Sequence, residues 1–257
     1  MTLAEKYALF CHFADKAGIN ETDKKTAFAE KCRREYLTSD ATKNSGMQWT
    51  CLQNNDRDEA WNADLWDNFD KKDRITDNSY TPERVRYRVL FDMDGVLARF
   101  LKGKTMEEVF SKGYFRNLEP LHNMTEAVSI LVADGNVDVG ILSKTSYQGM
   151  AEKYAWLLEN TPSIDSDSIY FVPLESEKSI FIPNFDPEYD FLIDDYQKNL
   201  DSFEGQKMKC VNDINSPTEK YPNIYYDETP GTIAYTIEKH VFDYAKAKNE
   251  PEEEIER

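Results

Sequence analysis

The sequence predicts an α/β fold, in which an open parallel sheet has helices on both faces and follows a helical extension. From Tyr87 onward, short apolar runs alternate with segments whose apolar residues recur at helical spacing. This alternation is typical of parallel βαβ units. Polar residues follow several of the apolar runs, and open α/β sheets bind their ligands at that end of the strands.

Residues 1–85 differ in character from the rest and are expected to form a helical N-terminal extension. Thr2 and Glu5 make a capping-box pattern, and a second helix is expected over 22–37. The role of the extension stays open. Its tryptophans suit a small core, a lid or a partner surface that includes a homodimer contact.

Residues 86–250 are expected to form the core domain, followed by a charged tail over 251–257. Apolar runs bounded by turn residues predict the strands. The expected strands are 87–92, 137–142, 168–172, 189–194 and 207–211.

Helices are expected between these strands, and cap signals place their ends. Thr105 with Glu108 predicts a short helix over 106–112, and Asn123 with Glu126 predicts the start of one over 124–134. A third helix carries Met150 to Leu158, and Thr229 with Pro230 begins the last, over 230–247.

Composition excludes some function classes. The 257 residues carry a net charge of −17, which disfavours binding to a nucleic acid polymer. No apolar run reaches the roughly 18 residues of a membrane span. The four cysteines show no metal-binding spacing and fit reduced thiols, so a cytoplasmic location is expected.

Polar side chains follow the expected strands at one edge of the sheet. Asp92 and Asp94 follow the first strand, Ser143 and Lys144 the second, and Asp194 and Asp195 the fourth, while Lys178 lies within loop reach of the third. Carboxylates this close together repel one another unless a cation lies among them, and hard oxygen ligands suit Mg²⁺.

A cation, a carboxylate nucleophile and an amine around one point suit phosphoryl transfer. Asp92 would attack phosphorus, and Asp94 would exchange protons with the leaving oxygen and with water. Ser143 and Lys178 would stabilise the equatorial oxygens. Gly95 permits the turn after the two acids.

Four stretches resemble the four motifs of the haloacid dehalogenase-like (HAD) superfamily. They read "VLFDMDGVLARF", "VGILSKTS", "EKS" and "FLIDDYQKNL". The second aspartate, Asp94, is similar to that of phosphatases in the superfamily. Over residues 87–245 the chain looks most like the 5'(3')-deoxyribonucleotidases and their bacterial and phage relatives.

The resemblance implies a HAD-like Rossmannoid core with a role for each matched residue. Asp92 resembles the nucleophile and Asp94 the acid/base, and the metal would be held by Asp92, the Asp94 carbonyl and Asp194. Asp195 would bind it through water or orient Lys178. The phosphate would be held by Ser143, Lys144 and Lys178, with Phe100 near the substrate.

The chain departs from the family pattern in its cap. Only a short helical cap, around 100–120, separates the first two motifs, and no base-stacking aromatic pair can be matched to it. Phe110, Tyr114 and Phe115 are candidates to replace that pair, although core packing is expected for at least one of them. Tyr196 stands where the animal enzymes often carry arginine.

The function expected from these features is that of a Mg²⁺-dependent phosphomonoesterase, a 5'-nucleotidase acting on nucleoside monophosphates. One alternative is a phosphatase for another small ester, such as a sugar phosphate. Another is an adaptor protein whose N-terminal helices bind a partner and whose phosphatase core is secondary.

Overall fold

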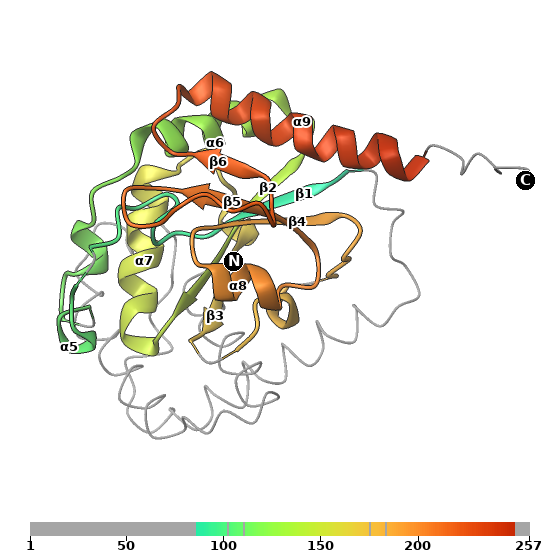
Figure 1. The fold of residues 1–257 in the computed structure, drawn as a ribbon. Coiled ribbons are helices and arrows are strands. Elements are labelled where there is room, and N and C mark those ends of the chain that lie inside the picture. The colour runs from blue at the N-terminus through green and yellow to red at the C-terminus, as the bar shows by residue number, and fades with distance from the viewer. Residues whose placement is uncertain (1–85, 102, 110, 175, 183, 250–257) are drawn as a thin grey trace, which may run out of the picture.

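The computed structural model describes residues 86–101, 103–109, 111–174, 176–182 and 184–249 (Figure 1). The expected N-terminal extension, its partner surface, the charged tail and Phe110 lie outside these residues. None of the described helices is both long enough and apolar enough to cross a membrane.

The core is a six-stranded parallel sheet with the order β3-β2-β1-β4-β5-β6. The chain moves outward from β1 to β3, then crosses back so that β4 lies on the other side of β1. The order therefore reverses between β1 and β4, and a crevice forms at such a point. The strands are β1 (Arg88–Phe91), β2 (Asp138–Thr145), β3 (Ile169–Pro173), β4 (Asp190–Asp194), β5 (Gln206–Val211) and β6 (Asn223–Tyr225).

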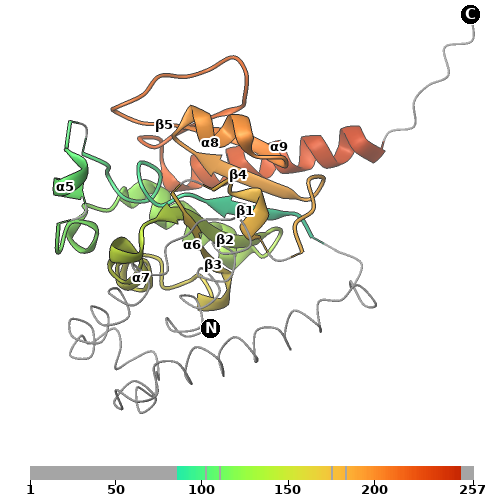
Figure 2. The ribbon, with the colours of Figure 1, turned by 90° about the horizontal axis from the view of Figure 1, so that it is seen from below.

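Side chains of each strand alternate between two apolar clusters, one on each face of the sheet. In β1, Val89 and Phe91 enter the larger cluster and Leu90 the smaller one. Helices α6 (His122–Asp134), α7 (Tyr147–Asn160) and α9 (Pro230–Asn249) contribute to the larger cluster. The opposite face is covered by α8 (Gln197–Ser202) and the 3₁₀ turn η5 (Ser179–Phe181) (Figures 1 and 2).

The parallel sheet with helices on both faces confirms the expected fold class, and the five expected strands are all present. One boundary differs in a way that matters for the site. Strand β2 continues to Thr145, because Ile141 to Thr145 pair with Ile169 to Pro173 of β3. Ser143 and Lys144 therefore lie within the strand and not after it. The sixth strand, β6, was not predicted from the sequence.

The cap patterns in the sequence predicted the start of α5 correctly and the start of α6 incorrectly. Thr105 and Glu108 form the expected capping box before α5 (Met106–Val109), which stops short of residue 112. The expected cap by Asn123 is wrong, because α6 begins at His122 after Leu121. The Leu121 N–H donates to the Leu97 carbonyl over 2.7 Å, so a tertiary contact fixes this helix end.

The chain leaves the core after β1 and returns before α6. Ala98 and Pro120 form an antiparallel bridge, and the Arg99 N–H donates to the Glu119 carbonyl over 2.8 Å. Residues 99–119, the cap segment below, project from this stem and contain α5 and the 3₁₀ turn η3 (Phe115–Asn117). A further 3₁₀ turn, η4 (Ser166–Ser168), precedes β3.

Candidate active site

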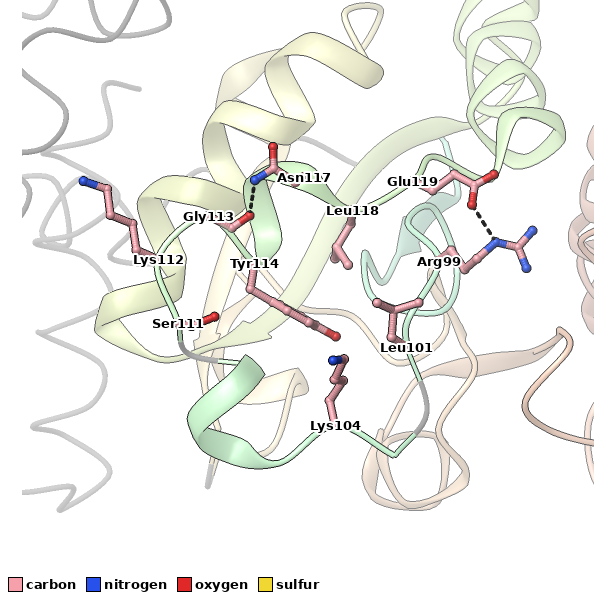
Figure 3. Close-up of a pocket in the computed structure, with 10 residues that line it drawn as sticks. All are labelled: Arg99, Leu101, Lys104, Ser111, Lys112, Gly113, Tyr114, Asn117, Leu118 and Glu119. Carbon is pink, nitrogen blue, oxygen red and sulfur yellow. Dashed lines mark hydrogen bonds and ion pairs between the residues drawn. The ribbon is translucent and has the colours of Figure 1, made fainter.

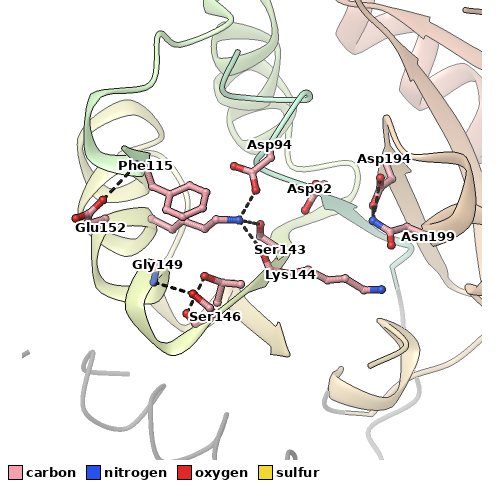
Figure 4. A network of polar contacts seen from close by, with 12 residues as sticks. Asp92, Asp94, Phe115, Ser143, Lys144, Ser146, Gly149, Glu152, Asp194 and Asn199 are labelled. Carbon is pink, nitrogen blue, oxygen red and sulfur yellow. Dashed lines mark hydrogen bonds and ion pairs between the residues drawn. The ribbon is translucent and has the colours of Figure 1, made fainter. Parts of the chain in front are cut away.

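Three carboxylates meet at the crevice between β1 and β4. Asp92 directly follows β1, while Asp194 ends β4 and Asp195 comes next. Each offers an oxygen within 4.8 Å of the others. Because Phe91 pairs with Ile193 in the parallel register, the residues that follow them emerge at the same edge (Figure 4).

Lys178 provides a positive charge inside this cluster. It precedes η5, its side chain is 1% exposed, and its ammonium lies 2.8 Å from Asp92 Oδ1 and 2.6 Å from Asp194 Oδ2. Burial alone would lower the pKa of Lys178, but the carboxylates of Asp194 and Asp92 raise it above its ordinary value. Lys178 is therefore charged at neutral pH.

Both oxygens of Asp194 are occupied by hydrogen bonds. Oδ1 accepts from the Tyr196 N–H over 2.8 Å, and Oδ2 accepts from Lys178 over 2.6 Å. The Asn199 amide is 3.3 Å from Oδ1 and 3.1 Å from Oδ2. These hydrogen bonds fix the Asp194 carboxylate at the end of β4 and tie the Lys178 ammonium to it.

Asp195 has more lone pairs available than Asp194. Its Oδ2 accepts from Asn212 Nδ2 over 3.0 Å, and Lys209 donates to its backbone carbonyl. Burial, followed by the charges of Asp194 and Asp92, raises the pKa of Asp195 to about 7. Among the described residues, the Asp195 carboxylate is therefore held by an amide hydrogen bond and forms no ion pair, although the Lys209 charge lies close enough to oppose the rise in its pKa.

Gly95 allows the loop after β1 to pass beside Asp195. Its φ of +77° lies in the left-handed region, and a Cβ there would come within 2.2 Å of Asp195 Oδ2. Asn212 Nδ2 also donates to the Gly95 carbonyl over 2.7 Å and so links this loop to Asp195. Any larger residue at position 95 would displace the carboxylate.

The charges of this cluster do not balance. Lys178 pairs with Asp92 and Asp194, and Asp195 adds a third carboxylate. Burial, followed by the Asp92 charge, raises the pKa of Asp194 despite its lysine. Clustered carboxylate oxygens with too little positive charge are the donor set that Mg²⁺ prefers, so the residues present fit this ion.

Asp94 lies apart from the three clustered carboxylates and has its own cation. Its Oδ2 pairs with the ammonium of Lys153, whereas its buried Oδ1 has no hydrogen-bond partner among the described residues. Burial raises the pKa of Asp94, the Lys153 charge opposes that shift, and the Asp92 charge adds to it. The orphaned oxygen and the raised pKa both suit a carboxyl group that exchanges protons.

Lys153 joins Asp94 to strand β2. Its ammonium also donates to Ser143 Oγ over 3.1 Å and to the Lys144 carbonyl over 2.6 Å, and it lies 4.7 Å from the centre of the Phe115 ring. Figure 4 shows Phe115 on the cap side of Asp94, opposite Asp92 and Asp194. The apolar ring helps to keep water from the Asp94 ion pair.

The structure brings most of the expected site residues together. Lys144 is partly buried, and burial with the nearby Lys178 charge lowers the pKa of its amine. Phe100 instead packs against the larger apolar cluster, so its contact with substrate stays a prediction. The residues placed near one another are Asp92, Asp94, Ser143, Lys178, Asp194 and Asp195.

Sequence reasoning missed several residues that hold the site. Lys153 lies within "AEKYAWL", where charged residues occupy positions between those of the apolar face. Asn199 lies within the stretch "FLIDDYQKNL" after β4, but the resemblance implied no role for it, and Asn212 follows β5 outside any motif. Only the position of these asparagines, close behind strand ends at the active edge, could have indicated a role.

A family model matches part of this chain. The model described as "5' nucleotidase, deoxy (Pyrimidine), cytosolic type C protein" matches residues 104–225. The match contains Ser143, Lys178, Asp194 and Asp195, and it begins after Asp92 and Asp94.

Two relatives from strains of Staphylococcus epidermidis carry the name "Putative 5'(3')-deoxyribonucleotidase". One is 29% identical over 48% of this chain and 64% of its own length. The other is also 29% identical, over 42% of this chain and 55% of its own length. The chain therefore matches less than two thirds of the length of each relative.

Among solved structures, one similar to this chain is the D,D-heptose 1,7-bisphosphate phosphatase from Burkholderia thailandensis, with a TM-score of 0.40 and 13% identity. That similarity covers 60% of this chain and 99% of the other. The family match and the two relatives lead to one identification: this chain resembles the 5'(3')-deoxyribonucleotidase family of HAD-like phosphatases.

Proposed function

We propose that this protein is a Mg²⁺-dependent phosphomonoesterase that removes phosphate from nucleoside 5'-monophosphates, deoxyribonucleotides included. The observation that carries the proposal is the separation of two kinds of carboxylate at one strand end. Asp92 lies in the cluster with Lys178, and Asp94 lies outside it with Lys153. Two carboxyl groups in different environments can act as nucleophile and as acid/base.

In the first step, an oxygen of Asp92 attacks phosphorus in line with the ester bond. The bond between phosphorus and the ester oxygen breaks, and protonated Asp94 gives its proton to that oxygen as the alcohol leaves. Lys178 lies beside Asp92 and stabilises the negative charge on the phosphoryl oxygens. The product is an aspartyl-phosphate on Asp92.

In the second step, water attacks the phosphorus of the aspartyl-phosphate. Asp94, now a carboxylate, takes a proton from that water, and the bond between phosphorus and the Asp92 oxygen breaks. Phosphate leaves, and both carboxyl groups return to their starting states. The raised pKa of Asp94 favours a group that serves first as acid and then as base.

Mg²⁺ would be held by Asp92 and Asp195, with Asp194 behind them. Bound there, it would offset the carboxylate charge and draw electron density from the phosphoryl oxygens. This division exchanges the roles that the resemblance implies for Asp194 and Asp195. It rests on hydrogen bonding, since Asp194 already accepts at both oxygens.

A panel of phosphate esters assayed with Mg²⁺ tests the proposal. The panel holds deoxyribonucleoside and ribonucleoside 5'-monophosphates, 3'-monophosphates, sugar phosphates and glycerol 3-phosphate. The largest kcat/KM is expected for a nucleoside 5'-monophosphate. A sugar phosphate as best substrate would replace the nucleotidase assignment, and no turnover of any ester would overturn the phosphatase assignment.

Asp138→Asn is a matched control for variants of the site. Asp138 is an exposed aspartate at the opposite end of β2, so the same chemical change is made far from the carboxylate cluster. Turnover by Asp138→Asn should equal that of the wild type within error.

A further inference from the structure

One buried carboxylate on α7 has no part in the steps above. Glu152 precedes Lys153, is 3% exposed, and points to the cap segment while Lys153 points to Asp94. Its Oε1 accepts from the Gly113 N–H over 2.7 Å and its Oε2 from the Phe115 N–H over 3.2 Å. Among the described residues, no cationic side chain pairs with it, so two backbone amides stabilise this charge.

The two anchored amides flank Tyr114. Gly113 has a φ of +85°, a conformation that glycine adopts without strain, and the Phe115 ring is 3% exposed. Tyr114 contacts that ring edge to face, with centroids 5.1 Å apart. With the backbone fixed on both sides, Tyr114 has little freedom to move away from its position.

Tyr114 lines a cavity of about 500 Å³ within the cap segment. Figure 3 shows its side chain directed between Lys104 and Leu101, with Leu118 on the same wall. A cavity of this size lies within the range of roughly 300–1,000 Å³ that is typical of small-molecule sites.

A chain of contacts links the Tyr114 wall of the cavity to Asp94. Phe115, adjacent to Tyr114, covers Lys153, and Lys153 pairs with Asp94. Burial, and after it the charge of Asp94, raises the pKa of the Tyr114 hydroxyl. A leaving group that extended from Asp94 past the Phe115 ring would meet Tyr114.

We infer that Glu152 is a positioning residue: it fixes Tyr114 on the wall of the leaving-group cavity and so sets the preference for a large leaving group over a small one. The inference rests on the proposed function, because it concerns the leaving group of that reaction. A nucleoside would contact the Tyr114 wall, whereas a short alcohol would not reach it.

Two other contacts between α7 and the cap segment supply comparisons. Trp156 Nε1 donates to the Leu118 carbonyl over 2.8 Å inside the core. Arg116 pairs with Glu159 at the surface, where both side chains are exposed. Glu159→Gln is therefore a matched control, with the same substitution on the same helix opposite the same segment. An exposed pair of this kind contributes little to stability.

The test compares Glu152→Gln, Glu159→Gln and the wild type on two alkyl esters, a deoxyribonucleoside 5'-monophosphate and glycerol 3-phosphate. Glutamine keeps one acceptor and places an NH₂ donor against an N–H, so one anchor is lost. Glu152→Gln should lose about 10-fold in kcat/KM for the nucleotide, chiefly through KM, because a charge-assisted hydrogen bond is removed. With glycerol 3-phosphate it should change by less than about 2-fold, and Glu159→Gln should leave both values unchanged.

Hydrogen exchange at the Gly113 and Phe115 amides tests the anchor without turnover. Exchange should be faster in Glu152→Gln than in the wild type and unchanged in Glu159→Gln. Equal losses on both esters, or unchanged exchange, would overturn the inference and leave the proposed function intact. If the wild type hydrolysed neither ester, the proposed function would fail and the inference about the leaving group with it, whereas faster exchange would still establish the anchor.

Discussion

Buried carboxylates lie at both ends of the β1–β4 pair, but only the one at the amino end is matched by positive charge. At the amino end, Arg88 faces Asp190 in register and donates to both of its oxygens, over 2.7 Å and 2.9 Å. The Asp186 N–H adds a third bond to Asp190, over 2.8 Å. At the carboxyl end, Asp92 and Asp194 share the charge of Lys178, and Asp195 adds a third carboxylate beside them.

The comparison shows how one pair of strands separates stability from function. The amino end is complete in itself, because a bidentate guanidinium matches one carboxylate in charge and geometry. The carboxyl end has excess negative charge, so a cation or bound protons would stabilise it. We therefore expect mutations at the amino end to affect unfolding and those at the carboxyl end to affect turnover and ligand binding.

The largest effect is expected for Asp92→Asn at the incomplete end. Removal of the nucleophile should lower kcat by more than about 10³-fold. Without Mg²⁺ the free energy of unfolding should not fall, because one of the repelling carboxylates becomes neutral. Steady-state assays and urea unfolding at 25 °C measure the two quantities. Wild-type turnover by this variant would show that Asp92 is not the nucleophile.

The second effect is expected at the complete end. Arg88→Met removes the two charge-assisted hydrogen bonds that Arg88 donates to the buried Asp190 and should lower the free energy of unfolding by about 3 kcal/mol. The kcat of the folded variant should stay within about 2-fold of wild type, because substitutions far from the reacting groups act mainly on stability. Arg116→Met, which breaks an exposed ion pair, is the control and should cost under about 1 kcal/mol.

The sequence predicted the fold at the level of its strands. Apolar runs such as 189–194 located the strands because both faces of a parallel sheet are buried. Ends set by tertiary contacts were predicted less well. Pairing with β3 extends β2 past Ser143 to Thr145. The start of α6 is fixed by the Leu97 carbonyl and not by Asn123. Neither partner is near in sequence to the residue that it determines.

Some residues of the candidate site could likewise be predicted from the sequence, and others could not. Asp92 and Asp194 could be located because each follows an apolar run directly, and Asp94 because it lies one residue beyond Asp92. Lys153 and Glu152 could not, because helical spacing predicts which face of α7 is buried and not which charged residues are buried with it. The ion-pair partner of Lys153 lies in the loop after β1, and the amides that bind Glu152 lie in the cap segment.

A third prediction concerns Mg²⁺ at the incomplete end. At 100 times the dissociation constant, Mg²⁺ should raise the free energy of unfolding by about 2.7 kcal/mol, if it binds only the folded protein. Asp195→Asn should lose most of this gain, and Asp138→Asn should keep it. Urea unfolding with Mg²⁺ or EDTA measures the difference. A full Mg²⁺ effect in Asp195→Asn would remove that residue from the metal site.

The smallest effect expected is a pH dependence in the metal-free protein. Asp195 has a pKa of about 7 in the folded chain against an ordinary value of 3.8, so the folded state binds more protons between these values. The contribution of Asp195 to the free energy of unfolding is therefore fully present below about pH 4 and is lost as pH rises through 7. With EDTA, the free energy of unfolding should be higher at pH 5 than at pH 7.5 by at least about 1.4 kcal/mol on account of Asp195, the equivalent of one pKa unit. Asp195→Asn should remove that part, whereas Asp138→Asn should retain it. An equal pH slope in Asp195→Asn and wild type would mean that the excess charge at this end rests on Asp94 and Asp194, whose pKa values are also raised.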